Sequence, residues 1–293
     1  TLQNGSGDNG GGMYLTGSDP TITNVIISGN TTSSNGGGMF LTLSNPTITN
    51  VTISGNTTNY YGGGMYTQAS NPILTNVIIS GNTTNDYGGG MYLNASDPTI
   101  TNVTISGNTT SNNGGGMFLN ASNPTLQHTI LAGNESNEIE FYSEGDSSTI
   151  LISYSNIEGG QDSIVTNDNG TVTWGSGNID VDPMFVDSAN GNYHLLATSQ
   201  LINAGHPDST DSDGTVADIG AYPYLNSYSG PTWYISESGN DTTATGASGD
   251  PFRSIQSGIN FSSVDDSVTV AAGTYVENIN FRGRNIKVAG ADR

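Results

Sequence analysis

Four aspartates lie within one short acidic segment, at Asp208, Asp211, Asp213 and Asp218. Carboxylate oxygens are the ligands that Ca²⁺ prefers, and closely spaced aspartates beside a glycine are typical of part of a calcium loop. The bidentate glutamate that completes an EF-hand loop is missing here. The segment is therefore a candidate calcium site, and the alternative is a solvated acidic loop. No other cofactor is expected.

A second candidate site is a row of aromatic residues that recurs every 26 residues. An exposed column of rings could stack on sugar rings or on a partner, whereas a covered column would stiffen the protein. Strand alternation places this row on the outside unless a loop covers it. Its members are Tyr14, Phe40, Tyr66, Tyr92 and Phe118.

Asparagines recur with the same period in two rows. Asn24 begins the first row and Asn30 the second. Asparagine tolerates left-handed backbone at turns, and stacked amides can hydrogen-bond to one another, so ladders at turns are favoured over ligand rows. The second row also fits the glycosylation pattern Asn-x-Ser/Thr. Its candidate glycan acceptors are Asn30, Asn56, Asn82 and Asn108.

The elements that must position these side chains follow from an internal repeat. The letters Gly-Gly-Gly-Met-aromatic occur five times, beginning at Gly10, Gly36, Gly62, Gly88 and Gly114. A fixed period in this range predicts a solenoid. Period-two runs within each block, such as 13–15, 21–23 and 25–27, predict three short strands separated by turns.

Comparison of equivalent positions indicates which side chains face inward. The columns that begin at Met13, Leu15, Ile22 and Ile27 remain almost entirely apolar and are expected in the core. The column that begins at Ile26 alternates between Ile and Thr, which favours a surface row. Because one coil cannot bury its own apolar face, the coils must stack on one another.

Composition excludes several classes of partner. The net charge is −21, and every Lys and Arg lies after residue 252. Such a chain repels nucleic acid and anionic membranes. Cysteine is absent, which excludes disulfides, and we expect no insertion into a membrane because no apolar run is long enough. We interpret the chain as a mature or excised segment.

The repeat Asn45–Thr58, followed by Gly62–Tyr66, resembles right-handed parallel β-helix proteins of the pectate-lyase-like superfamily, in particular secreted surface proteins. The resemblance implies an all-β solenoid with 26-residue coils. The segments 177–208 and 218–224 resemble the closing part of secreted, anchored β-helix proteins. The segment 233–281 resembles an opening part, in which 251–261 forms a short capping helix.

These resemblances predict four parts: regular coils over 1–140, irregular closing coils and a cap over 141–224, a linker over 225–232, and the start of a following β-helix over 233–293. The closing part precedes the opening part. A slice of a tandem array, a subunit that stacks on its neighbour, and a circular permutation all explain this order. Unfinished solenoid ends are edges that can pair with copies of the chain.

We therefore expect an extracellular or cell-surface structural protein, a subunit of a filament or array assembled head to tail. The alternative is a carbohydrate-binding adhesin, and a polysaccharide-active enzyme ranks third. The superfamily's lyases use an Arg or Lys base, which the repeats lack, and the hydrolase motifs are absent. His128, His194 and His206 are scattered, and His128 occupies the turn position of the first Asn row.

Overall fold

The computed structural model describes residues 1–291, which form two compact units. Unit 1 comprises Thr1–Val181 together with Ile219–Ala221. Unit 2 comprises Asp182–Asp218 and residues 222–291. The predicted linker, 225–232, lies inside unit 2.

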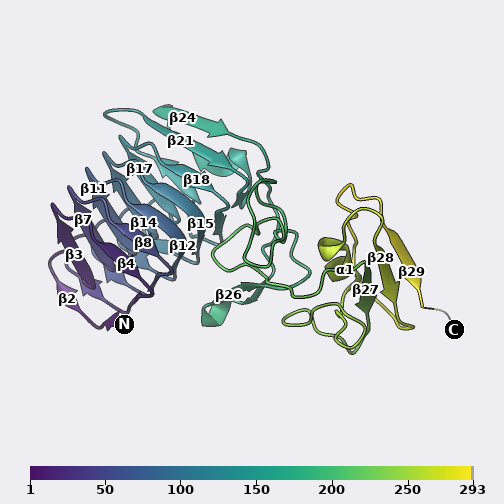
Figure 1. The fold of residues 1–293 in the computed structure, drawn as a ribbon. Coiled ribbons are helices and arrows are strands. Elements are labelled where there is room, and N and C mark those ends of the chain that lie inside the picture. Colours follow the sequence, from purple (N-terminus) through teal and green to yellow (C-terminus); the bar gives the residue numbers. More distant parts are fainter. Residues whose placement is uncertain (292–293) are drawn as a thin grey trace. The chain divides into compact units, whose positions relative to one another are not determined.

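Unit 1 is a solenoid of stacked coils whose strands form three parallel sheets (Figure 1). The first complete coil contains β3 (Met13–Thr16), β4 (Thr21–Thr23), β5 (Ile26–Ser28) and β6 (Thr31–Thr32). The short strand β6 was not expected from the sequence. In two later coils the second and third strands join into β12 (Ile73–Ser80) and β15 (Thr99–Ser106).

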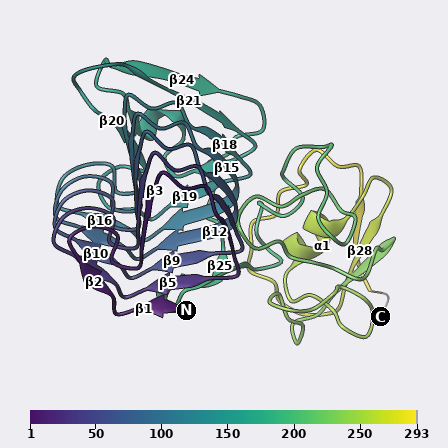
Figure 2. The ribbon, with the colours of Figure 1, turned by 60° about the vertical axis from the view of Figure 1, so that its left-hand side comes forward.

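The sheets are built from equivalent strands of successive coils. The 12-stranded sheet contains, besides β4, β5, β12 and β15, the strands β1 (Leu2–Gln3), β8 (Thr47–Thr49), β9 (Thr52–Ser54), β18 (Thr125–Gln127), β19 (Ile130–Ala132), β21 (Ser148–Ser153), β22 (Asn156–Ile157) and β24 (Gly170–Trp174). The seven-stranded sheet joins β3 to β7 (Met39–Thr42), β11 (Met65–Gln68), β14 (Met91–Asn94), β17 (Met117–Asn120), β20 (Ile139–Phe141) and β23 (Ile164–Val165). The five-stranded sheet joins β6 to β2 (Ser6–Gly7), β10 (Thr57–Thr58), β13 (Thr83–Thr84) and β16 (Thr109–Thr110), and lies across the coils from β5, β9 and β12 (Figure 2).

The strand register reproduces the sequence period. Met65 pairs with Met39 on one side and with Met91 on the other, so like residues lie on like. Paired strands lie about 4.8 Å apart, and each coil donates its backbone hydrogen bonds to the next. The predicted all-β solenoid with 26-residue coils is therefore confirmed.

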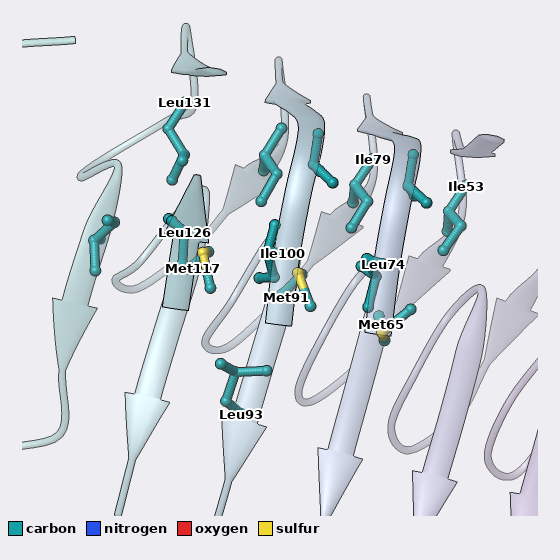
Figure 3. Close-up of a cluster of buried hydrophobic side chains, with 14 of the residues drawn as sticks. Ile53, Met65, Leu74, Ile79, Met91, Leu93, Ile100, Met117, Leu126 and Leu131 are labelled. Atoms are coloured by element: carbon teal, nitrogen blue, oxygen red, sulfur yellow. The ribbon is translucent and has the colours of Figure 1, made fainter. Parts of the chain in front are cut away.

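The core consists of apolar columns that run along the solenoid (Figure 3). Met65, Met91, Leu74 and Ile79 are fully buried, as the comparison of equivalent positions predicts. Thr67 replaces leucine in one column and is also fully buried, and its hydroxyl has no hydrogen-bond partner among the described residues.

The glycine triplet is required by the close approach of neighbouring coils. Gly62 has a left-handed backbone, with φ of 69°, which disfavours any side chain. A Cβ atom on Gly63 would lie 2.4 Å from the carbonyl oxygen of Gly89 in the next coil. Main-chain atoms on both sides leave no room for a methyl group, so this position excludes side chains by contact and not by backbone conformation.

The predicted surface row that begins at Ile26 is wrong for the later coils. Ile26 is exposed, but Ile78, Thr104 and Ile130 are buried. The segment Ile219–Ala221 returns to unit 1, where the Gly220 N–H donates to the His128 carbonyl and the Ala221 N–H donates to the Thr104 hydroxyl. A distant part of the chain thus covers one end of this row.

The expected loss of the 26-residue register after residue 134 is only partial, and the strands continue. Met117 pairs with Ile139, 22 residues on, whereas Ile130 pairs with Asn156, 26 residues on. The short 3₁₀ helix η1 (Gln161–Ser163) interrupts these coils. Three aspartates of the closing segment accept main-chain N–H groups. Asp180, Asp182 and Asp187 accept from Gly159, Met184 and Asn190.

Unit 2 contains an antiparallel pair and a parallel sheet. The pair is β25 (Phe185–Asp187) with β26 (Asn192–Leu195), joined by η2 (Ser188–Asn190). The sheet is β27 (Thr232–Ile235), β28 (Ser267–Val270) and β29 (Lys287–Gly290). The helix expected near 251–261 is α1 (Ile255–Phe261), and residues 275–281 form no strand. None of the helices in residues 1–291 has the length and hydropathy needed to cross a membrane.

Candidate functional site

The second asparagine row forms a buried ladder through unit 1. Each Nδ2 donates to the Oδ1 of the next Asn and also to a main-chain carbonyl; for Asn82 the acceptors are Asn108 Oδ1 and the Ile53 carbonyl, both at 2.9 Å. The backbone N–H of each Asn donates to that same Oδ1 of its neighbour. All the amides point the same way along the solenoid, so every bond polarises the next one.

This ladder corrects the prediction of glycan acceptors. Asn30, Asn56, Asn82 and Asn108 are buried, and the nitrogen that would carry a glycan is the donor in the ladder. A sugar on that nitrogen has no space in the folded coils. The turn-ladder interpretation is therefore the correct one for this row.

A carboxylate ends the ladder. The Nδ2 of Asn134 donates to Glu138 Oε2 at 2.6 Å, and the Asn134 backbone N–H donates to Oε1 at 3.2 Å. Glu138 thus takes the position of the asparagine that the next coil would supply. The side chain is 5% exposed, and burial, together with the nearby charge of Glu158, raises its pKa to about 7.

Glu138 and Glu158 line one wall of an acidic groove in unit 1. The groove encloses about 610 Å³ and is also lined by Glu135 and Asp162. Glu158 Oε2 accepts the Gly133 N–H at 2.6 Å. A carboxyl pair in which one member ionises near neutrality can hold and release a proton. Periodicity cannot reveal the pair, because the equivalent positions 26 residues earlier carry no acidic residue.

The aromatic row is stacked but mostly covered, which corrects the prediction of an open ligand-stacking face. Tyr14 is 51% exposed, whereas Phe40, Tyr66 and Tyr92 are 7% and Phe118 is 2% exposed. Successive rings stack with centroids 4.9–5.3 Å apart. The aromatic side chains point to the outer side of the sheet, as expected, and other residues cover them.

Those covering residues are tyrosines from neighbouring turns. Tyr61 stacks on Tyr92 with centroids 4.6 Å apart, and Tyr87 lies 4.6 Å from Phe118. Both take a position at which other coils carry asparagine. Burial, followed by the charge of Asp86, raises the pKa of the Tyr61 and Tyr87 phenols. Together with Tyr60 and Tyr142 they form an outer tyrosine layer, of which Tyr60 is 53% exposed.

The four aspartates predicted to bind calcium lie in unit 2, and the carboxylates of three of them accept hydrogen bonds from the local backbone. Asp218 accepts the N–H groups of Asn203 and Tyr224. Asp211 accepts the Asp218 N–H, and Asp213 accepts from Thr215 and Asn226.

No group of three or more His, Cys, Asp or Glu suited to a metal ion was found in residues 1–291. The calcium site at Asp208, Asp211, Asp213 and Asp218 stays a prediction; in this arrangement both carboxylate oxygens of Asp213 and of Asp218 accept hydrogen bonds. Burial, with the neighbouring carboxylates, raises the pKa of Asp218 to about 8 and that of Asp211 to about 6. For Asp213, hydrogen bonds from Asn226 and Thr215 outweigh burial and lower the pKa.

The remaining candidates have structural roles. The first asparagine row has left-handed backbone, with φ of 57° at Asn24, and Asn50 Nδ2 donates to Asn24 Oδ1 at 3.3 Å. His128 replaces asparagine in this row, with φ of 49° and its Nδ1 lying 3.0 Å from Asn102 Oδ1. The turn role expected for His128 is confirmed.

Stacked parallel coils with continuous side-chain ladders define a β-helix protein. Residues 3–105 and 75–182 match the family described as "Right handed beta helix region", and the chain belongs to that family. Residues 237–281 match a second family, described as "Protein of unknown function (DUF1565)". No curated protein and no solved structure matched the chain.

Proposed function

We propose that this protein is an extracellular structural protein, a subunit of a filament or surface array whose β-helix units join end to end. The observation that carries the proposal is that both units contain parallel sheets built by stacking, with edge strands at their ends. β3 is the outermost strand of its sheet in unit 1, and β29 is the outermost strand in unit 2. Such edges pair readily with a further strand.

The interior of the solenoid supports this role. The asparagine ladder, the aromatic stack and the apolar columns are engaged in contacts between coils. A stack that adds identical rungs gains the same contacts with each addition. The scarcity of charge in the repeats and the net charge of −21 suit an exposed, soluble surface outside the cell.

A variant at the edge of unit 1 tests the proposal. Met13 and Gly17 donate their N–H groups to the next coil, to Gly38 and Thr42. Because successive N–H groups of a strand point to opposite sides, the Thr16 N–H points to the open edge. Thr16→Pro removes that donor and should abolish filaments or oligomers while preserving the folded monomer.

The matched control is Thr42→Pro, at the equivalent position one coil further on. By the same alternation, the Thr42 N–H faces the first coil, so this variant should lose stability whether or not the protein assembles. Light scattering and negative-stain imaging over a concentration series provide the readout. A wild-type chain that remains monomeric at every concentration would sink the proposal.

Glycan binding is a second candidate function, and the outer tyrosine layer favours it. Tyr61, Tyr87 and Tyr142 pack on the aromatic row. Within that row the Tyr66 hydroxyl accepts a hydrogen bond from Asn94, which in turn accepts one from Asn120. Rings with nearby hydrogen-bonding groups suit an uncharged sugar, and the absence of Lys and Arg in residues 1–252 disfavours an acidic one. A glycan array with wild type and Tyr60→Ala distinguishes binding from a purely structural layer.

A further inference from the structure

Two arginines of unit 2 lie side by side with little to neutralise them. Arg282 Nη1 donates to the Ile202 carbonyl at 2.7 Å. Arg284 Nη1 donates to the carbonyls of Ile259 and Asn260, also at 2.7 Å. Arg282 and Gly283 both have left-handed backbone, with φ of 54° and 69°. This turn brings both side chains to the C-terminal end of α1.

The hydrogen bonds of the two guanidinium groups leave much of their capacity unused. Each group carries five N–H donors in a planar fork that matches an oxyanion. Within residues 1–291 the side-chain hydrogen bonds of both groups use Nη1 alone, and they go to neutral main-chain carbonyls instead of carboxylates.

The charges of the two groups are also destabilised by their surroundings. Burial and the charge of Arg284 lower the pKa of Arg282 to about 10, although Asp218 opposes this, and burial lowers the pKa of Arg284. Two half-buried cations that repel each other are unfavourable without an anion. An incoming oxyanion would remove both penalties at once.

We infer that Arg282 and Arg284 together form a binding site for a carboxylate group presented by a second copy of this chain. The assignment of a second copy as the source rests on the proposed end-to-end assembly, whereas the site itself does not. Paired guanidinium groups can bind a carboxylate through two parallel N–H···O bonds each, and such bonds are about twice as strong as neutral ones.

The distribution of charge along the chain favours this partner. Residues 1–252 contain 22 acidic residues and no Lys or Arg, a net charge of −22, whereas residues 253–293 contain five basic and four acidic residues, a net charge of +1. At the β3 end of unit 1, which the proposed assembly brings to unit 2 of another copy, Asp8 and Asp19 are exposed. The acidic coils of one copy therefore complement the arginine pair of another.

Sedimentation velocity of the full chain over a concentration series tests the site. The series is run at about 20 mM salt, where charges act over roughly 20 Å. The double variant Arg282→Gln/Arg284→Gln should weaken association at least about tenfold, as expected for the loss of charge-assisted hydrogen bonds. The control Arg253→Gln removes one exposed positive charge of unit 2 and should change association less than about twofold.

Two further measurements separate the site from folding and from general charge effects. Arg282→Lys/Arg284→Lys keeps both charges but loses the planar forks, so it should also weaken association. Sodium sulfate, compared with sodium chloride at equal ionic strength, should compete with the carboxylate in wild type and have no such effect on the Gln variant. Circular dichroism verifies that each variant is folded.

Each outcome decides between the two proposals. If the folded Gln variant associates as wild type does, the arginine site is refuted and the assembly stands. If wild type never associates, the assembly is refuted, and sulfate then tests the site alone. Sulfate should raise the melting temperature of wild type by more than it raises that of the Gln variant. Equal melting temperatures in sulfate and chloride for wild type would overturn the site.

Discussion

The strongest test of the β-helix core is the substitution Asn82→Ala in the middle of the buried ladder. The Asn82 side chain donates to the Ile53 carbonyl and to Asn108 Oδ1. It accepts the backbone N–H of Asn56 at 3.0 Å and the Asn56 Nδ2 at 2.9 Å. Alanine removes all four bonds and leaves the Asn56 N–H buried without its acceptor.

The magnitude follows from the number of groups left unpaired. Each buried polar group that loses its partner costs about 1–3 kcal/mol, and the Asn56 N–H and the Ile53 carbonyl are the most affected. A loss of about 2–6 kcal/mol in the free energy of unfolding is therefore expected. For a unit of this size, each kcal/mol lowers the melting temperature by about 2–4 °C.

The matched control is Asn85→Ala, three residues further along the same coil. Asn85 is exposed, and its Nδ2 lies 3.4 Å from Asn59 Oδ1, so its loss should cost no more than about 0.5 kcal/mol. Urea and thermal unfolding followed by circular dichroism measure the difference, and hydrogen exchange locates it in the coils. If the two variants differ by less than about 1 kcal/mol, the ladder does not hold the coils together as argued.

Three further predictions concern single positions. Glu138→Gln should remove a pH dependence of the free energy of unfolding. The folded pKa of Glu138 is raised to about 7, so the stability that the protonated side chain contributes is fully present below about pH 4.5 and is lost as the pH rises through 7. The variant should therefore be more stable than wild type at pH 8 by up to about 3 kcal/mol, and equal pH–stability profiles of the two proteins would contradict this. Gly63→Ala should destabilise the fold by more than Gly55→Ala does. At Gly55 φ is 61° and no atom lies within 4 Å of the added methyl group, so that variant should cost roughly 1–2 kcal/mol. Denaturant unfolding that ranks Gly55→Ala as the worse variant would refute the close-contact argument. Thr67→Val replaces a buried unpaired hydroxyl by a methyl group of similar size and should stabilise the protein by about 1 kcal/mol; a lower urea midpoint than that of wild type would show that the hydroxyl has a role.

The site was harder to predict than the fold because its parts depend on exceptions to the repeat. Tyr61 and Tyr87 occur where other coils have asparagine, and an isolated substitution carries no signal of what it covers. Glu138 lies only four residues after Asn134, and its carboxylate accepts the hydrogen bond that an asparagine of the next coil would otherwise accept. The 26-residue period does not predict this exchange. The aspartates around Asp213 suggested a metal, but oxygen ligands can serve a turn equally well.

The sequence by itself determined the architecture of the regular coils. The 26-residue period and the apolar columns that begin at Met13 and Leu15 specify which side chains face inward, because stacking repeats every contact at the same position of each coil. The asparagine rows indicate the turns.

Only the tertiary structure decided what covers the outer faces of those coils. Ile130 is buried because Ile219–Ala221 returns to it from far along the chain, and Tyr92 is buried because Tyr61 lies on it from a neighbouring turn. Periodicity reports only the contacts that every coil shares. A contact made once, between residues distant in sequence, leaves no period to detect, and its position is set by the packing of the whole chain.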